Sequence, residues 1–349
     1  MDRALGGVGR GGVGRTRTGL PSRPFRHRVG GAAVSTAPRG VVWGVLVWSV
    51  LWLLWAASPL ACGPARAQPL VVATTPDLRG VTEAVAAGLV RVESLVPPGA
   101  DAEAFAPRPG HLALVRGASL VVRVGLGHDE WLDRLLARDG LDRLRRGGEG
   151  HLDLSATVAL LEVQGRSVET RSGHAHGAAN PHYWLDPANA EPMAAAVAEA
   201  LVRLLPERRG EIEAAHARFA AGLRARLDAW TARLAPHRGA AVVAYHNGWP
   251  YFARRFRLNI VDVVEPKEGV PPSPARLAAL AATMRERGVR AILHETTAPD
   301  AASRALAART GARVVPLAPS VGAAPDAGDL FALFERNVAL LAAALDAGG

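Results

Sequence analysis

The strongest constraint on the fold is an alternation of short β-branched runs with helical patterns, which occurs twice along the chain. The first series has apolar runs at residues 70–75, 89–96 and 118–125, separated by helical patterns at 77–87 and 108–116. Strands that alternate with helices are typical of parallel sheets, because each helix returns the chain to the same edge of the sheet. We therefore expect a parallel α/β lobe here.

A second series of four runs ends at His246, Glu265, Glu295 and Leu317, and it predicts a second parallel α/β lobe. Between the two series, residues 187–234 are rich in Ala, Arg, Glu and Leu with helical periodicity. Pro206 interrupts this stretch and fits the first turn of a second, long helix. The expected boundaries are an N-terminal lobe at 68–205, an interlobe helix at 206–236 and a C-terminal lobe at 237–349.

Residues 1–67 have the pattern of an export signal. Arginines up to Arg39 precede an uncharged run at 41–60, and a small-residue cleavage site follows at Ala65-Arg66-Ala67. We expect cleavage before Gln68 and a periplasmic or otherwise extracytoplasmic protein. An uncleaved anchor is an alternative because the run is about long enough to span a bilayer, and Cys62 in "PLAC" is compatible with a lipid anchor. Since Cys62 is the only cysteine, we expect no disulfide in the mature chain.

The formal charge of +9 does not indicate a nucleic-acid partner, because the excess lies in the leader. Nine arginines and one aspartate precede Gln68, whereas the remainder carries 32 basic and 31 acidic residues. The chain also lacks a G-x-S-x-G elbow, an H-E-x-x-H helix and a phosphate-binding loop. These observations give no support to nucleic-acid binding or to the common enzyme classes.

Four side chains are candidates for a metal site between the lobes. Ligands of open α/β sheets bind beyond the carboxyl ends of the strands, where His246 and Glu295 end two runs and Glu103 follows another. His182 lies in the loop just before the central helices. Two imidazoles and two carboxylates suit a divalent transition metal: nitrogen ligands favour zinc, and carboxylates admit manganese or ferrous iron.

Each candidate also has an ordinary structural interpretation. His182 can cap a helix or stack in a core beside its aromatic neighbours, Glu295 can pair with an arginine, and Glu103 can be a solvated loop residue. Because His294 and Glu295 are adjacent in a strand, only one of them faces the cleft.

The other histidines and two late aspartates are expected outside the site. His174 and His176 are predicted to lie on a loop that captures metal only transiently. Five further histidines are expected on the surface or on helices: His111, His128, His151, His216 and His237. Asp326 and Asp329 are expected in a loop and at a helix cap.

These segments together resemble the substrate-binding proteins of zinc- and manganese-type ABC importers. The resemblance extends over residues 70–346 and rests on "PGADAEAFAPRP", "GASLVVRVGLGHDEWLD", "NPHYWLDPANA", "YHNGWPYFARRF", "EPKEGVPPSP" and "GARVVPLAPSVG". It implies two α/β lobes joined by a long rigid helix, with His182 and His246 as metal ligands. Glu103 falls where the family usually has histidine, and "APSVG" lacks the family's usual aspartate. Glu295 is the expected substitute, with Glu265 in reserve, and "GHAHG" resembles a shortened histidine-rich loop.

The resemblance implies a non-enzymatic function. We expect extracytoplasmic capture of a divalent metal, zinc before manganese or iron, and delivery to an ABC-type permease by a monomeric protein. The alternatives are a secreted metallohydrolase that uses the same residues and a surface adhesin that depends on metal.

Overall fold

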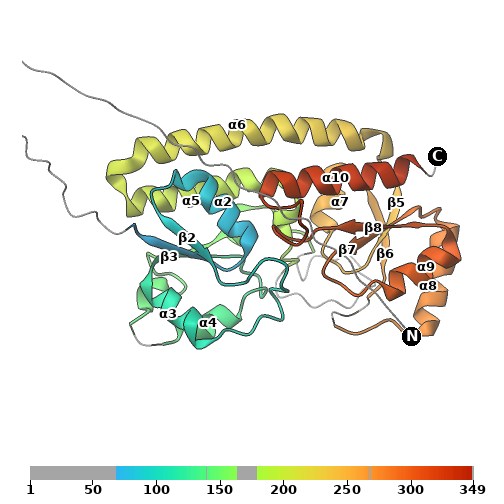
Figure 1. Cartoon of the computed structure of the whole chain (residues 1–349), viewed down its shortest axis with the longest axis horizontal. Coiled ribbons are helices and arrows are strands. Elements are labelled where there is room, and N and C mark those ends of the chain that lie inside the picture. The colour runs from blue at the N-terminus through green and yellow to red at the C-terminus, as the bar shows by residue number, and fades with distance from the viewer. Residues whose placement is uncertain (1–67, 139, 163–178, 266, 268, 348–349) are drawn as a thin grey trace, which may run out of the picture. The chain divides into compact units, whose positions relative to one another are not determined.

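The computed structural model describes residues 68–138, 140–162, 179–265, 267 and 269–347. Within these residues, eight strands form two four-stranded sheets in which all neighbouring strands are parallel (Figure 1). The first sheet contains β1 (Leu70–Ala73), β2 (Arg91–Ser94), β3 (Ala118–Arg123) and β4 (His151–Asp153). The second contains β5 (Ala241–Ala244), β6 (Asn259–Val263), β7 (Ala291–Glu295) and β8 (Arg313–Leu317).

The two sheets have the same topology. Their strand orders are β2-β1-β3-β4 and β6-β5-β7-β8, so the first strand of each series lies inside its sheet with the next strand on one side and the third on the other. The expected α/β class with two parallel sheets is confirmed. In such an order, successive strands are added first on one side of β1 or β5 and then on the other. Ligand sites of α/β proteins are found at this switch point.

Helices connect and cover the strands, and several begin at residues that the sequence marks as caps. Thr75, Ser273 and Asp329 each accept a hydrogen bond from a backbone N–H in the first turn of the following helix. The α-helices are α2 (Pro76–Ala86), α3 (Pro109–Gly117), α4 (Trp131–Leu136), α5 (Ala190–Leu204), α6 (Arg209–Leu234), α7 (Pro250–Phe256), α8 (Pro274–Glu286), α9 (Ala301–Thr310) and α10 (Leu330–Asp346). Short 3-10 helices are η1 (Asp142–Leu144), η2 (Leu154–Thr157), η3 (Tyr183–Leu185), η4 (Pro187–Asn189), η5 (Pro206–Arg208) and η6 (Ala235–His237).

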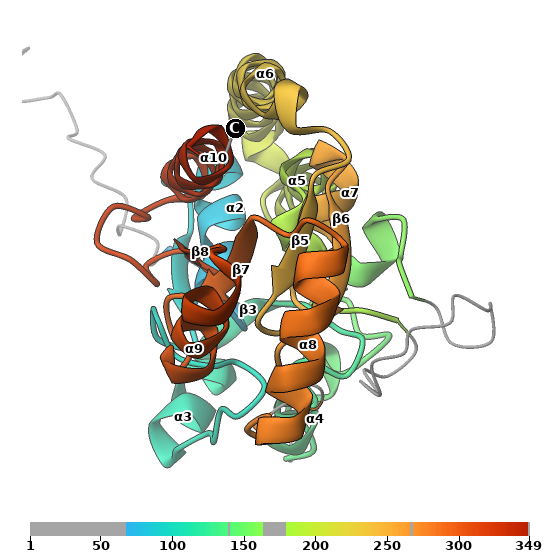
Figure 2. The same cartoon turned by 90° about the vertical axis from the view of Figure 1, so that its right-hand side faces the viewer.

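Both faces of the central strands β5 and β7 of the second sheet are buried, which explains their nearly continuous apolar sequences. Val243 and Ile292 belong to a core with residues of α8 and α9, whereas Val242 and Leu293 belong to the core that includes α10. Figure 2 shows α8 and α9 on one side of β7 and α10 on the other. The first sheet follows the same rule, because its alternate residues face either the core with α2 and α5 or the core with α4.

The longest helix, α6, packs against α5 and α2 of the first series and against α10 from the end of the chain (Figure 1). Trp230 on α6 is buried and donates a hydrogen bond from Nε1 to Glu335 Oε2 on α10, at 2.8 Å. Phe219 on α6 stacks on Phe331 of α10 with ring centroids 5.5 Å apart. This helix lies within the predicted interlobe segment 206–236, while the lobe boundaries themselves stay a prediction.

Among the strands and α-helices, α4 and β4 were not expected from the sequence. β4 has only three residues, His151–Asp153, without a β-branched run, and its pairing with β3 gives it the strand conformation. His151 therefore belongs to a strand, contrary to the expectation of a surface or helix position.

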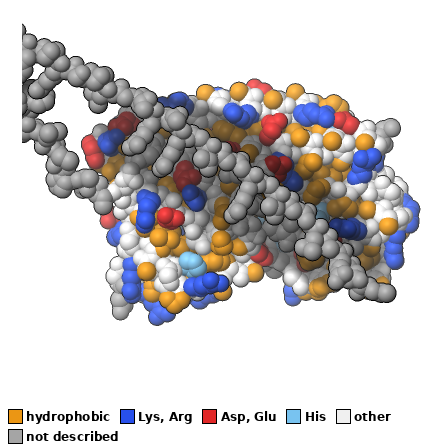
Figure 3. All heavy atoms as spheres, in the orientation of Figure 1, with side chains coloured by type: hydrophobic (Ala, Val, Ile, Leu, Met, Phe, Trp, Pro, Cys, Tyr) orange, Lys and Arg blue, Asp and Glu red, His pale blue; other side chains and the backbone are white. Residues whose placement is uncertain are grey.

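The leader at 1–67, with Cys62, and the segment with His174 and His176 lie outside the described residues. No helix among the described residues is both long and apolar enough to cross a membrane. On the face drawn in Figure 3, basic and acidic side chains are interspersed rather than separated.

Candidate metal centre

A cavity of about 310 Å³ lies where the carboxyl ends of the two sheets meet. Its walls include residues that follow β1, β2 and β3 of the first sheet and residues at the ends of β5 and β7 of the second. All four predicted ligands line it, as does the reserve carboxylate: Glu103, His182, His246, Glu295 and Glu265. The neighbour of Glu295, His294, instead contacts Ser303 and the Tyr245 ring, so the expected opposite orientation of these two residues is confirmed.

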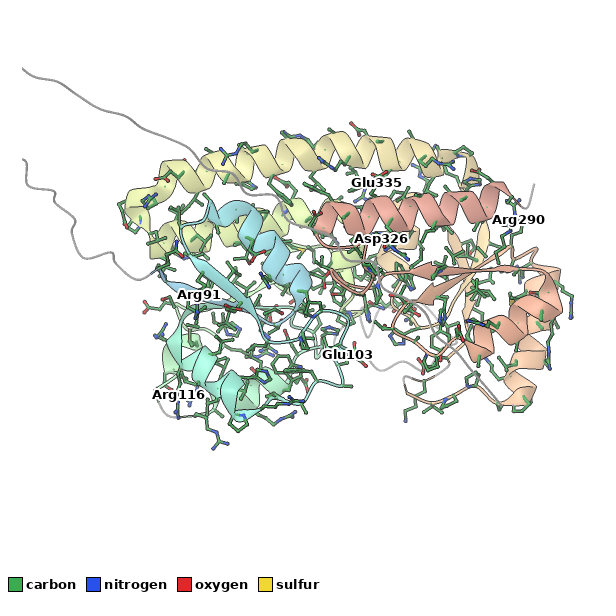
Figure 4. The ribbon with its side chains drawn as sticks, viewed as in Figure 1. Arg91, Glu103, Arg116, Arg290, Asp326 and Glu335 are labelled. Carbon is green, nitrogen blue, oxygen red and sulfur yellow. The ribbon has the colours of Figure 1, made fainter. Side chains whose placement is uncertain are left out.

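Among the described residues, Glu103, His128 and His182 form a group whose potential ligand atoms all lie within 4.8 Å of one another. We call this group the first-sheet cluster. Glu103 Oε1 is 2.8 Å from His128 Nδ1 and 3.9 Å from His182 Nε2. Figure 4 labels Glu103 on the loop that follows β2. Both histidines are buried, and the Glu103 side chain is 17% exposed. The structure therefore brings two of the four predicted ligands together.

The orientation of His182 is fixed by Asn180. The Asn180 side-chain amide donates from Nδ2 to Asn247 O and to Glu162 Oε2, at 2.9 and 3.1 Å, which leaves its Oδ1 as an acceptor. That oxygen accepts from His182 N at 3.0 Å and lies 3.2 Å from His182 Nδ1. With the Nδ1 proton directed at Asn180, the lone pair of the ring is on Nε2, the atom that belongs to the first-sheet cluster.

His246 extends the site toward the second sheet. It follows β5, and its ring centroid is 5.4 Å from that of His182. His246 Nδ1 is 3.6 Å from Glu265 Oε2, while Glu265 Oε1 accepts a hydrogen bond from Gly269 N. The reserve ligand Glu265 thus lies on the Nδ1 side of His246, at a distance longer than a hydrogen bond.

Glu295 is the last residue of β7 and is buried against Trp249. Trp249 Nε1 donates to Glu295 Oε1 at 2.5 Å, whereas Oε2 is buried without a hydrogen-bond partner among the described residues. Burial raises the pKa of Glu295 to about 7, and the charge of His246 partly opposes this rise. A buried carboxylate with one oxygen unused is a suitable ligand for a cation, although Glu295 is not part of the first-sheet cluster.

The expectation that His128 is a surface or helix residue is wrong. His128 lies in the turn after β3, is buried, and contacts the rings of Trp184 and His182 with centroids 5.0 and 5.7 Å away. Its position after a central strand was a usable signal, because Glu103 was selected by the same rule. The Gly-rich sequence around His128 is equally typical of an exposed turn, and the resemblance assigned no ligand there.

Asp129 is responsible for the burial of this turn. Its carboxylate accepts hydrogen bonds from Val124 N and Gly125 N and pairs with the buried Arg123 guanidinium at 2.8 Å. Trp131 Nε1, just beyond, donates to Ala102 O at 2.9 Å, so the turn is tied to the loop that carries Glu103. These contacts place His128 and Glu103 side by side.

The remaining histidines and aspartates serve the structure around them. His111 Nδ1 accepts from Arg108 N at the start of α3, His216 lies on α6, and His237 in η6 is buried and pairs with Asp346. Asp329 caps α10 and Asp326 lies in the preceding loop, as expected.

Comparison with known proteins decides the family. A family model described as "Zinc-uptake complex component A periplasmic" matches residues 71–344. The chain belongs to this family. The expected resemblance to substrate-binding proteins of metal importers is therefore confirmed over nearly the whole described part of the chain.

Individual relatives agree with this assignment. The chain is 29% identical over 269 residues to the high-affinity zinc uptake system protein ZnuA of Paracoccus denitrificans, covering 68% of this chain and 79% of that protein. It is 28% identical over 251 residues to a putative metal-binding protein of Treponema pallidum, covering 70% and 77%. Among solved structures, a zinc-bound deletion mutant of ZnuA superposes with a TM-score of 0.66 at 28% identity, over 79% of this chain and 97% of that one.

Proposed function

We propose that this protein captures a divalent transition metal ion, zinc foremost, outside the cytoplasm and delivers it to an ABC-type membrane permease. The observation that carries the proposal is the convergence of Glu103, His182 and His246 on one cavity at the carboxyl ends of both sheets. Imidazole nitrogens and carboxylate oxygens are the ligands zinc prefers in proteins, and manganese and iron accept the same set. The metal is the transported cargo.

The proposed donor set is Glu103, His182, His246 and Glu295. The first two come from the side of the first sheet and the other two from the second, so an ion bound by all four links both halves of the protein. A cargo site formed by two halves opens when they separate, which provides a route for release. Glu265 has the supporting role of orienting His246.

Relatives support transport in preference to hydrolysis. The similar proteins of Paracoccus denitrificans and Yersinia pestis are named high-affinity zinc uptake system proteins, and one of Streptococcus pneumoniae is named a zinc-binding lipoprotein. These names and the family description support an extracytoplasmic location and a permease as partner. We further propose that the protein acts as a monomer without nucleic acid.

Zinc titration of the chain from residue 68 onward, stripped of metal with a chelator, tests this function. We expect one ion per chain with submicromolar affinity, on the order of −8 kcal/mol or stronger. Native mass spectrometry of the protein recovered from the exported fraction identifies the ion that is bound in the cell. A folded protein that binds none of zinc, manganese and iron would contradict the proposal.

A further inference from the structure

We infer that His128 coordinates the captured metal through a ring nitrogen, together with Glu103 and His182. This inference rests on the proposed function and adds a donor to the four proposed ligands. It assigns a third imidazole to the site.

The spacing of the atoms fits a shared ion. Two ligand atoms bound to a tetrahedral zinc at ~2.0 Å lie about 3.3 Å apart. In the first-sheet cluster, Glu103 Oε1 is 2.8 Å from His128 Nδ1 and 3.9 Å from His182 Nε2, so the observed separations bracket that value. Since all potential ligand atoms of the cluster lie within 4.8 Å of one another, these separations are compatible with one shared ion.

The environment of the His128 ring also points to a ligand. Nδ1 pairs with Glu103, whereas Nε2 is buried and has no hydrogen-bond partner among the described residues. A buried imidazole usually satisfies both nitrogens, because an unpaired polar atom in the interior costs about 1–3 kcal/mol. Coordination of the ion by Nδ1, in place of its present contact with Glu103, would offset this cost.

The turn that carries His128 is rigid enough for preorganised binding. The buried Arg123–Asp129 pair closes it, and Trp131 ties it to the loop of Glu103. His128 also contacts Trp184, the second residue after His182 in the sequence, with ring centroids 5.0 Å apart. The two imidazoles are therefore held by a common set of contacts.

A site with three imidazoles has a chemical consequence. The nitrogen donors are then His128, His182 and His246. The first-sheet side supplies two imidazoles even though Glu103 stands where the family usually has histidine. Such a set favours zinc over manganese, because imidazole suits zinc while manganese prefers oxygen ligands.

The test compares His128→Ala with His128→Asn. An asparagine amide replaces the Nδ1–H donor and keeps the hydrogen bond to Glu103, but it supplies no imidazole. Zinc affinity is measured by competition titration, and the number of imidazoles on the bound zinc is measured by X-ray absorption. His216→Ala on α6 is the matched control, and circular dichroism establishes folding of each variant.

We expect both His128 variants to bind zinc at least about tenfold more weakly and to show one imidazole fewer on the metal, while His216→Ala matches the parent. If His128→Asn keeps the affinity and the imidazole number of the parent, His128 only orients Glu103 and the inference is overturned. If the parent protein itself binds no zinc, the proposed function is overturned. This outcome differs from the one that overturns only the role of His128, in which the parent and His128→Asn bind zinc equally well.

Discussion

Asp77 at the start of α2 accepts a hydrogen bond from Ser320 Oγ at 2.5 Å and another from Val321 N at 2.9 Å, in the loop after β8. Asp77 and Ser320 are more than 240 residues apart in sequence, and both line the cavity. This contact links the two sheets at the edge of the proposed metal site.

The link gives stability a pH dependence. Burial raises the pKa of Asp77 from 3.8 to about 6, an effect that its hydrogen bonds with Ser320 and Val321 only partly oppose. Because the folded state holds this proton more tightly, the associated stability is present below pH ~3.8 and is lost as the pH rises through about 6, a loss of about 3 kcal/mol. Asp77→Asn should therefore flatten the pH dependence of the metal-free protein's unfolding free energy between pH 4 and 7.

Urea unfolding in the presence of a chelator measures this effect. Asp228→Asn, at an exposed position on α6, is the matched control and should leave the profile unchanged. An Asp77→Asn profile that parallels the parent would show that the Asp77 carboxyl does not titrate differently in the two states.

Removal of either central imidazole should weaken metal binding. His182→Ala and His246→Ala each delete an imidazole donor, the first of which is oriented by Asn180, and we expect losses of at least about tenfold to a hundredfold in zinc affinity. Isothermal titration of folded variants, with His216→Ala as control, provides the measurement. Unchanged affinity in either variant would remove that residue from the site.

Substitutions of Glu103 test whether its carboxylate is a metal ligand. If its carboxylate binds the ion, Glu103→Ala should weaken both zinc and manganese, whereas Glu103→His should restore zinc and shift selectivity toward it. Parallel titrations with the two metals compare these variants. If the Glu103→Ala protein binds both metals as tightly as the parent, Glu103 is not a ligand.

Glu295→Gln tests the contribution of the second sheet. Glutamine keeps an acceptor for Trp249 Nε1, so the fold should be retained, but it lacks the anionic oxygen. We expect weaker zinc binding, by about tenfold or more, in competition titrations at pH 8. Parent-like affinity would leave His246 as the second sheet's main donor.

The sequence predicted most strands because apolar β-branched runs report burial on both faces of a parallel sheet. It missed β4, since His151–Asp153 become a strand only through pairing with β3. Glu103, His246 and Glu295 could be placed at one cavity because strand ends converge. His128 could not, because its burial depends on the Asp129 contacts and on the Trp131–Ala102 hydrogen bond, which joins residues 29 positions apart.

Anomalous diffraction at the zinc edge, from crystals of the zinc-loaded protein, shows directly whether the metal binds between the two sheets. We expect one strong anomalous peak in the cavity between the two sheets, within about 2.0–2.2 Å of donor atoms from Glu103, His182 and His246. A zinc ion bound at another position, with these three side chains unliganded, would contradict it.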